Sequence, residues 1–119
     1  MKLEWFGRFE YIEDKVKELA EKHGGNYIIL VKLKNENYRP IYVGKADNLQ
    51  QRLLDHFSKK EPNPCLKEHM EKYTLGMRFC YVDSEDDRKN VEHTLYNHYS
   101  HECNEKEPEG KKIDINFPF

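Results

Sequence analysis

Long hydrophobic runs are missing from this sequence. No stretch approaches the roughly 20 apolar residues that a membrane-spanning helix needs, and the beginning, MKLEWFGRFEYIEDK, lacks the apolar region of a signal peptide. Internal repeats and low-complexity segments are missing too. These absences argue against a membrane protein and predict a cytoplasmic chain.

Cysteine is scarce as well. The 119 residues include three cysteines, Cys65, Cys80 and Cys103, and no CxxC pair. An odd number at long spacings predicts reduced thiols rather than a disulfide framework. A short stretch before Cys103 holds three histidines that suggest a zinc site: His93, His98 and His101. Because zinc ligands usually come as paired short spacings, solvated histidines near a helix end are the stronger interpretation.

An excess of charge of one sign is also missing. The chain has 20 Lys and Arg residues against 22 Asp and Glu residues, for a net charge of −2. No global field attracts polyanions, so nucleic-acid binding would require a local basic face. The length and the 37% hydrophobic content fit a single domain over residues 1–119 with one modest core.

Hydrophobic periodicity predicts the first half of the fold. Residues 11–23 place apolar side chains on one helical face, and the Gly24–Gly25 pair ends that helix. The run 27–33 is nearly all apolar, as in a strand covered on both faces. After a turn-prone loop, residues 40–44 complete a hairpin with it.

Capping residues mark the helices of the second half. Asp47 is expected to cap a helix, with Gln50 in the capping-box position. Residues 64–73 fit a short helix that follows a pair of prolines. A third strand is expected over 77–83, and Ser84 is expected to cap a longer helix.

This order of elements predicts an α/β (α+β) fold with a small three-stranded, largely antiparallel sheet flanked by helices. A polar tail over residues 105–119 follows the last helix. The apolar end of the tail is expected to dock as an edge segment, through Ile113, Ile115, Phe117 and Phe119. Fold class alone says nothing about chemistry.

Polar residues that packing does not require gather around the hairpin and the later helices. They are Tyr27, Tyr42, Gly44, Lys45, Arg52, His56 and Glu92. Gly44 is expected to let the chain turn, and Arg52 and His56 share a helix face at i and i+4. Each residue alone has an ordinary interpretation, as a strand aromatic, a surface charge or a turn glycine. Together these phenols and cations with one carboxylate indicate a phosphodiester site.

The order and spacing of these residues resemble the GIY-YIG nuclease family. The matching pieces are GNY at 25–27, YVG at 42–44, YVGKADNLQQR ending at Arg52, Glu92 in VEHTLY, and Asn104. Over residues 25–104 the sequence is similar to the N-terminal cleavage domain of the bacterial excision-repair nuclease. His56 matches a histidine of the restriction-enzyme branch. Asn26 departs from the usual apolar residue of the first motif, and in a strand its side chain is expected to point away from Tyr27.

The resemblance implies a metal-dependent DNA endonuclease that hydrolyses phosphodiester bonds, in repair or restriction. Glu92 would hold Mg²⁺ or Mn²⁺, with waters and substrate phosphate as further ligands. Tyr27 would be the general base with help from His56, and Arg52 would donate to phosphate oxygens. The other matching residues would support the site: Tyr42 by orienting water or phosphate, Gly44 and Lys45 at the turn, and Asn104 by bracing.

Two other interpretations stay open. A non-catalytic module of the same fold, binding nucleic acid or another partner, would fit the negative charge, the acidic run at 83–87 and the lack of room for a DNA-binding domain. A subunit that gains its specificity from a homodimer or a protein partner would use the apolar end of the tail as a contact.

Overall fold

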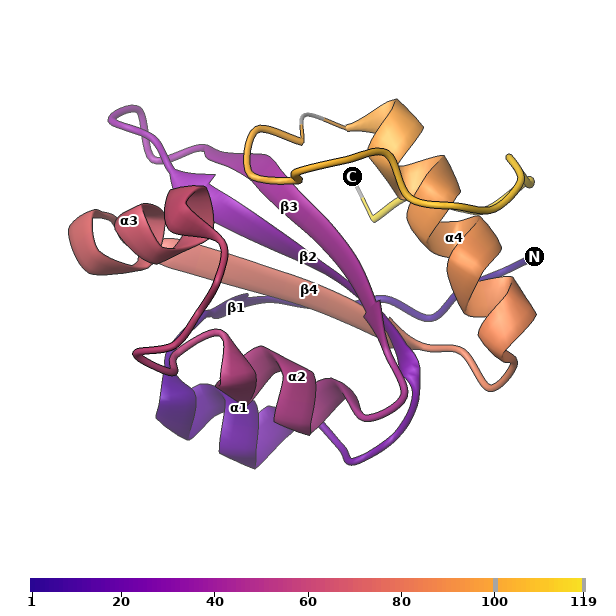
Figure 1. The fold of residues 1–119 in the computed structure, drawn as a ribbon, viewed down its shortest axis with the longest axis horizontal. Helices are drawn as coiled ribbons and strands as arrows, with labels where there is room; N and C mark the ends of the chain where they lie inside the picture. The colour runs from indigo at the N-terminus through magenta and orange to yellow at the C-terminus, as the bar shows by residue number, and fades with distance from the viewer. Residues whose placement is uncertain (100, 119) are drawn as a thin grey trace.

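The chain folds into an antiparallel sheet with helices on both faces (Figure 1). The computed structural model describes residues 1–99 and 101–118. The elements in chain order are β1 (Phe6–Glu10), α1 (Glu13–Leu19), β2 (Gly25–Lys32), β3 (Tyr38–Ala46), α2 (Leu49–Asp55), α3 (Pro64–Lys72), β4 (Leu75–Tyr81) and α4 (Glu85–His98). Within those two ranges, no helix is both long and apolar enough to cross a membrane.

Among the described residues, the sheet has four strands in the order β1-β4-β2-β3, and every neighbouring pair is antiparallel. The predicted α+β fold and its hairpin, β2–β3, are confirmed. The predicted sheet had three strands, one fewer than the structure has. The missed strand, β1, has the sequence FGRFE, in which a bulge between Gly7 and Phe9 breaks the two-residue alternation. Phe6 and Phe9 pack on Phe79 of β4, with ring centroids 5.7 and 6.0 Å apart.

The predicted helix over 11–23 is shorter in the structure, because Tyr11 belongs to the extended segment before it. The Tyr11 amide donates to the carbonyl of Leu75, and its buried hydroxyl donates to the carbonyl of Leu53 at 2.6 Å. The helix therefore begins at Glu13, and it ends at Leu19.

The cap of α2 is Asn48 rather than Asp47. Asn48 Oδ1 accepts from the amide of Gln51 at 3.0 Å, while Asp47 accepts instead from Nη2 of Arg88 at 2.9 Å. Asp and Asn both cap helices well, so the residue types alone did not show which of these two neighbours would be the cap. The predicted cap of α4 is confirmed, because the Ser84 hydroxyl accepts from the third helical amide.

Alternate residues of β2 face two different cores, so the strand is covered on both sides as its apolar run predicts. The core shared with α1, α2 and α3 takes Tyr27, Ile29 and Val31, and the core shared with α4 takes Ile28 and Leu30. Asn26 also faces α4, because its Nδ2 donates to the carbonyl of Arg88 at 3.0 Å. The expectation that Asn26 points away from Tyr27 is confirmed.

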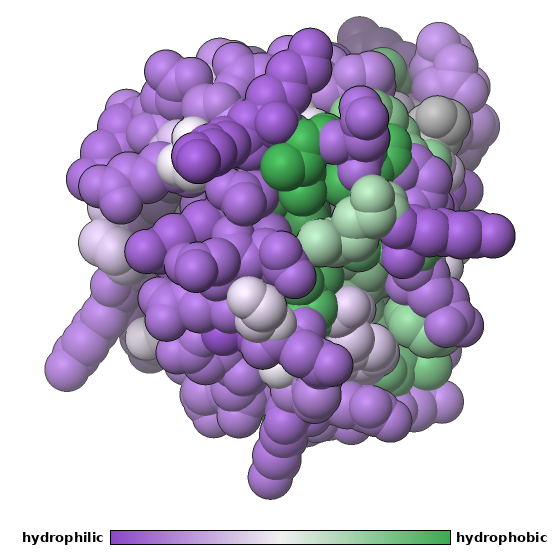
Figure 2. Space-filling view, turned by 90° about the vertical axis from the view of Figure 1, so that its right-hand side faces the viewer, coloured by the Kyte–Doolittle hydropathy of each residue, from purple (hydrophilic) through white to green (hydrophobic). Residues whose placement is uncertain are grey.

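The C-terminal tail docks along α4 and pairs with the N-terminal segment rather than with a sheet edge (Figure 1). Asn116 exchanges two hydrogen bonds with the backbone of Leu3, at 2.6 and 2.8 Å. The apolar side chains that pack on the α4 core are Ile113, Ile115 and Phe117; Phe119 lies outside the described residues. Figure 2 shows a band of apolar residues, bordered by hydrophilic ones, on the side where α4, the tail and the N-terminus lie.

Two of the three cysteines form a disulfide, which corrects the expectation of reduced thiols. Cys65 near the start of α3 bonds to Cys103 beyond α4, and Cys80 is free and buried. The pairing depends on long-range structure, because the Cys103 amide donates to the carbonyl of Ile41 and so draws this segment along β3. Spacing along the sequence carries no sign of that contact.

The three histidines that precede Cys103 do not join it in a cluster. They contact other groups: His93 the carbonyl of Pro108, His98 the ring of Phe117, and His101 the ring of Tyr96. The interpretation of these histidines as a zinc site therefore has no support in the structure.

Candidate functional site

Predicted site residues from three parts of the chain line one pocket at the edge of the sheet. Tyr42 and Lys45 come from the edge strand β3, Glu92 comes from α4, and Asn104 comes from the segment after α4. The pocket has a volume of about 560 Å³. We call these four residues the edge pocket. It draws on both faces of the sheet, because Tyr42 packs against the α2 side and Glu92 belongs to the helix on the other.

Asn104 fixes the segment beyond α4 to the edge of β3. Its Nδ2 donates to the carbonyl of Val43 at 3.0 Å, and its Oδ1 accepts from the Val43 amide at 3.1 Å. These bonds satisfy backbone groups that an edge strand otherwise leaves unpaired. The position beside Tyr42 and Glu92 suits the bracing role expected of Asn104.

Three further polar side chains form a row behind the pocket. Tyr27 Oη lies 2.8 Å from His56 Nε2, and His56 Nδ1 lies 3.0 Å from Glu61 Oε2. The side chains of His56 and Glu61 are 0% and 3% exposed, and Tyr27 is fully buried. We call Tyr27, His56 and Glu61 the buried row. The Glu61 carboxylate accepts a hydrogen bond from Nδ1–H of a neutral His56, whose Nε2 then accepts from the hydroxyl of Tyr27.

Gly44 makes room for Tyr27 instead of turning the chain. The two residues are direct partners in the β2–β3 pairing, and β3 continues through Gly44 to Ala46. A Cβ at residue 44 would overlap the ring and hydroxyl of Tyr27. The expectation of a turn at Gly44 is therefore corrected, because this glycine is needed for close approach within a strand.

Arg52 connects the edge pocket to the buried row. It projects from α2, and its charge acts on both Tyr42 and Tyr27, opposing the rise in the pKa of each phenol. The rings of the two phenols are stacked, with centroids 6.0 Å apart. Arg52 therefore acts electrostatically on one phenol of the pocket and one of the buried row.

The two phenols differ in how strongly their surroundings oppose ionisation. Burial, and next the neighbouring Tyr42, hold the pKa of Tyr27 well above its ordinary value, with only Arg52 acting in the other direction. Burial also raises the pKa of Tyr42, but the charge of Arg52 opposes the rise as the second-largest effect. The phenolate form is therefore better supported at Tyr42.

Burial shifts the pKa values of the histidine and the carboxylate in opposite directions. The pKa of His56 is lowered, first by burial and then by the charge of Arg52, against the opposing effect of Glu61. Burial raises the pKa of Glu92, while Lys45 and Arg52 pull it down. Both shifts favour the neutral forms, so His56 is able to accept a proton and Glu92 retains an affinity for one.

Sequence reasoning missed residues that organise the site. Glu61 follows α2 in a loop with no periodic pattern, so nothing local indicated that it would reach His56. Arg88 is buried, and its guanidinium donates to the carbonyls of Val82 and Asp83 as well as to Asp47. Asn63 had a readable signal, because an Asn directly before Pro64 is typical of a helix N-terminus.

The edge pocket fits a divalent cation bound through one carboxylate. Glu92 is half-buried and lines an open pocket, which leaves room for water and phosphate oxygens. Mg²⁺ commonly binds through one or two carboxylates and keeps several waters. The far wall of the pocket adds three more carboxylates, Glu105, Glu107 and Glu109. Oxygen donors of this kind suit Mg²⁺ or Mn²⁺ better than softer metals.

Fold and site together define the class of this protein: a small α+β domain with phenols, cations and the carboxylate of Glu92 gathered at a sheet edge, as in GIY-YIG domains. The chain belongs to the family of UvrC-like GIY-YIG domains, which matches it over residues 25–104. The resemblance drawn from the motifs is thereby confirmed.

Similar proteins carry the same name in different organisms. UvrABC system protein C of Methanococcus maripaludis is 39% identical over 83 residues, which are 70% of this chain and 15% of that protein. UvrABC system protein C of Bacteroides fragilis is 33% identical over 90 residues, 76% of this chain and 14% of that protein. The chain spans about one seventh of the length of these relatives. No solved structure matches it.

Proposed function

We propose that this chain is a metal-dependent DNA endonuclease domain that hydrolyses phosphodiester bonds at the edge pocket. The observation that carries the proposal is the convergence of Tyr42, Lys45 and Glu92 on one pocket, with the charge of Arg52 acting on both Tyr42 and Glu92. Membership of the UvrC-like GIY-YIG family supports it. Since the relatives are named for the UvrABC system, DNA repair is the proposed setting, and no observation favours restriction.

Glu92 would hold Mg²⁺ or Mn²⁺, and the bound cation would stabilise the charge that develops on the phosphoryl oxygens. Lys45 lines the pocket and Arg52 lies close enough to act on it, since both cations act on Glu92 electrostatically. Arg52 can present two parallel donors to a phosphate group. The raised pKa of Glu92 makes its ionisation, and with it cation binding, dependent on pH.

Tyr42 is the phenol that faces the substrate in this proposal. It lines the pocket, whereas Tyr27 is fully buried and has no path to a water or a phosphate in this arrangement. The charge of Arg52 also opposes the effect of burial on the pKa of Tyr42 more than it does at the fully buried Tyr27. Tyr42 therefore takes the base role that the motif alone assigned to Tyr27, and Tyr27 becomes its positioning residue.

The buried row offers a route for the proton. When Tyr42 receives a proton from water, its hydroxyl can turn to donate to Tyr27, whose own proton passes to Nε2 of His56. The imidazolium that results is paired with Glu61 at 3.0 Å. A buried carboxylate beside a buried imidazole stabilises its charged form, which keeps the route open.

A non-catalytic binding module is the second candidate, and one observation favours it. The segment 105–109 of the pocket lining has three glutamates, Glu105, Glu107 and Glu109, against one lysine, Lys106, and this acidic excess opposes the approach of a phosphate backbone. In this alternative, or in a subunit that depends on a homodimer or another protein for targeting, the isolated chain would bind a partner without cutting DNA.

Cleavage assays with the full chain test the proposal. Duplex, branched, flapped and single-stranded DNA are incubated with Mg²⁺ or Mn²⁺, and we expect at least one substrate to be nicked or cut. Glu92→Ala should slow cleavage by at least about 100-fold, because a group that stabilises transition-state charge is lost. Glu18→Ala, which removes an exposed carboxylate of α1 that does not line the pocket, is the matched control and should cut normally. Binding without cleavage across the whole panel would favour the module instead.

A further inference from the structure

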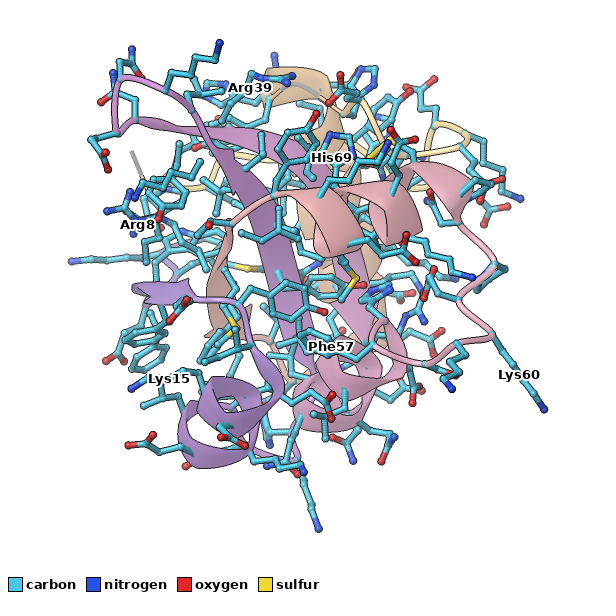
Figure 3. The ribbon with its side chains drawn as sticks, turned by 90° about the vertical axis from the view of Figure 1, so that its left-hand side faces the viewer. Arg8, Lys15, Arg39, Phe57, Lys60 and His69 are labelled. Carbon is cyan, nitrogen blue, oxygen red and sulfur yellow. A yellow bond between two sulfur atoms is a disulfide. The ribbon has the colours of Figure 1, made fainter. Side chains whose placement is uncertain are left out.

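A second cluster of metal-binding side chains lies away from the carboxylate of Glu92. Cys65 and His69 stand one helical turn apart on α3, and Cys103 joins them from the segment beyond α4. The ligand atoms of all three residues lie within 4.8 Å of one another. Figure 3 shows His69 beside the disulfide that joins the two cysteines.

The distances around His69 match those of a tetrahedral zinc site. Its Nδ1 lies 3.8 Å from Cys65 Sγ and 3.6 Å from Cys103 Sγ. Zinc bonds of about 2.3 Å to sulfur and 2.0 Å to nitrogen place such a pair of atoms roughly 3.5 Å apart. Only the two sulfurs are too close for a shared ion, because they are bonded to each other. Reduction removes that obstacle and leaves two thiols facing one imidazole nitrogen.

The other side of His69 is arranged as in many zinc sites. Nε2 lies 3.3 Å from Oε2 of Glu102, and Glu102 also accepts from Arg39 at 3.3 Å. A carboxylate that holds the distal N–H of a histidine directs the opposite nitrogen toward a metal and raises its basicity. In the disulfide form, Nδ1 instead lies 2.8 Å from the carbonyl of Cys65, a contact that metal binding would replace.

We propose that the reduced protein binds one zinc ion through Cys65, His69 and Cys103, with water in the fourth position. A dithiol reductant supplies two electrons and two protons to the disulfide and becomes a disulfide itself, leaving two protein thiols. Zinc then binds the two thiolates and neutral Nδ1 as the two thiol protons are released. Cys65 and His69 are half-buried rather than enclosed, which leaves the ion a path of entry.

The disulfide and the zinc ion would join the same two segments in different redox conditions. Cys103 directly precedes Asn104, a residue of the edge pocket that is hydrogen-bonded to the backbone of Val43. The Cys103 carbonyl accepts a hydrogen bond from Asn63 at 2.6 Å. Either link keeps the segment beyond α4 against α3 and β3. Thiolates and imidazole select zinc, whereas Mg²⁺ prefers oxygen donors, so this site and Glu92 would take different metals.

Cobalt spectroscopy tests the proposal on the full chain. The protein is reduced with a phosphine, freed of the phosphine and titrated with Co²⁺ in excess Mg²⁺. We expect one equivalent to produce thiolate-to-cobalt charge transfer and the strong visible bands of a tetrahedral site, and Zn²⁺ to displace it. Glu102→Gln should weaken binding by about 10-fold. His69→Ala should weaken it further, and Cys65→Ser should reduce the charge-transfer band, while Cys80→Ala leaves both readouts unchanged.

Several results would overturn the zinc site. Equal Co²⁺ binding by the oxidised protein is one, and a spectrum without thiolate bands is another. Unchanged binding by His69→Ala, which keeps the disulfide and so can be folded before reduction, is a third. Should reduction alone unfold the chain, Zn²⁺ is expected to restore its circular dichroism in the wild type and not in His69→Ala, and failure to restore the wild type counts against the site.

Discussion

The edge pocket and the buried row differ in what their side chains can touch. Tyr42 and Glu92 face an opening of about 560 Å³, whereas the side chains of His56 and Glu61 are 0% and 3% exposed. A group that contacts substrate must reach solvent, but a group that positions another or accepts its proton needs only its neighbour. The comparison reverses the roles that the resemblance gave the two tyrosines, because Tyr42 and not Tyr27 reaches the pocket.

Substitution of each tyrosine by phenylalanine tests this separation, and here we expect the largest effect. Tyr42→Phe removes the proposed base and should lower the cleavage rate by about 100-fold or more, the usual scale for proton transfer by a side chain. Tyr27→Phe should slow cleavage less, because it interrupts only the route behind Tyr42. Single-turnover cleavage at saturating Mg²⁺ measures both rates.

Stability should rank the same two variants in the opposite order. Tyr27→Phe leaves Nε2 of the buried His56 without its partner, which costs about 1–3 kcal/mol of unfolding free energy. Tyr42 is only half-buried, so Tyr42→Phe should unfold closer to the wild type. Urea denaturation provides the free energies. If Tyr27→Phe proved the slower enzyme while remaining as stable as Tyr42→Phe, the assignment of the two tyrosines would be reversed.

Gly44 offers a way to disturb the buried row by packing alone. Gly44→Ala places a methyl group against the ring and hydroxyl of Tyr27, and we expect a loss of about 3 kcal/mol, the upper part of the range for overpacking. Gly76→Ala is the matched control, because a methyl there meets the flexible side chain of Arg8 and the ring of Tyr38 at 3.1 to 3.2 Å. Similar melting temperatures for the two variants would mean that Tyr27 is free to shift.

Local patterns predicted the parts of the fold that local physics determines. The apolar run of β2 requires cover on both faces, and Ser84 satisfies an amide of its own helix. The motif residues Tyr42, Lys45 and Glu92 line one pocket within the part of the chain that matches the family, and their roles stay a prediction. In each case the prediction depends on residues within one strand or helix, or on the ordered motif residues of one family.

Features that depend on distant contacts were not predictable in this way. Glu61 meets His56 only because the loop after α2 folds back, and Cys65 meets Cys103 only because the chain returns along β3. Strand β1 is held by pairing with β4, across about 70 residues of sequence. These contacts form when the sheet assembles, and no short stretch of sequence encodes either partner's position.

The smallest expected effect concerns the carboxylate end of the buried row. His56 must be neutral to accept a proton, so wild-type cleavage should fall as the pH drops through the pKa of His56, which lies below its ordinary value of about 6.5. Glu61 raises that pKa, and Glu61→Gln should therefore lower it further and move the acidic limb of the pH–rate profile to lower pH. The plateau rate should fall by about 10-fold, since the imidazolium loses its partner.

Asp55→Asn is the control, because Asp55 is exposed and has the weakest of the five effects on the pKa of His56, so the acidic limb of this variant should barely move. Saturating Mg²⁺ keeps the ionisation of Glu92 from limiting the rate, and an acidic limb that moved to higher pH in Glu61→Gln would exclude His56 as the proton acceptor.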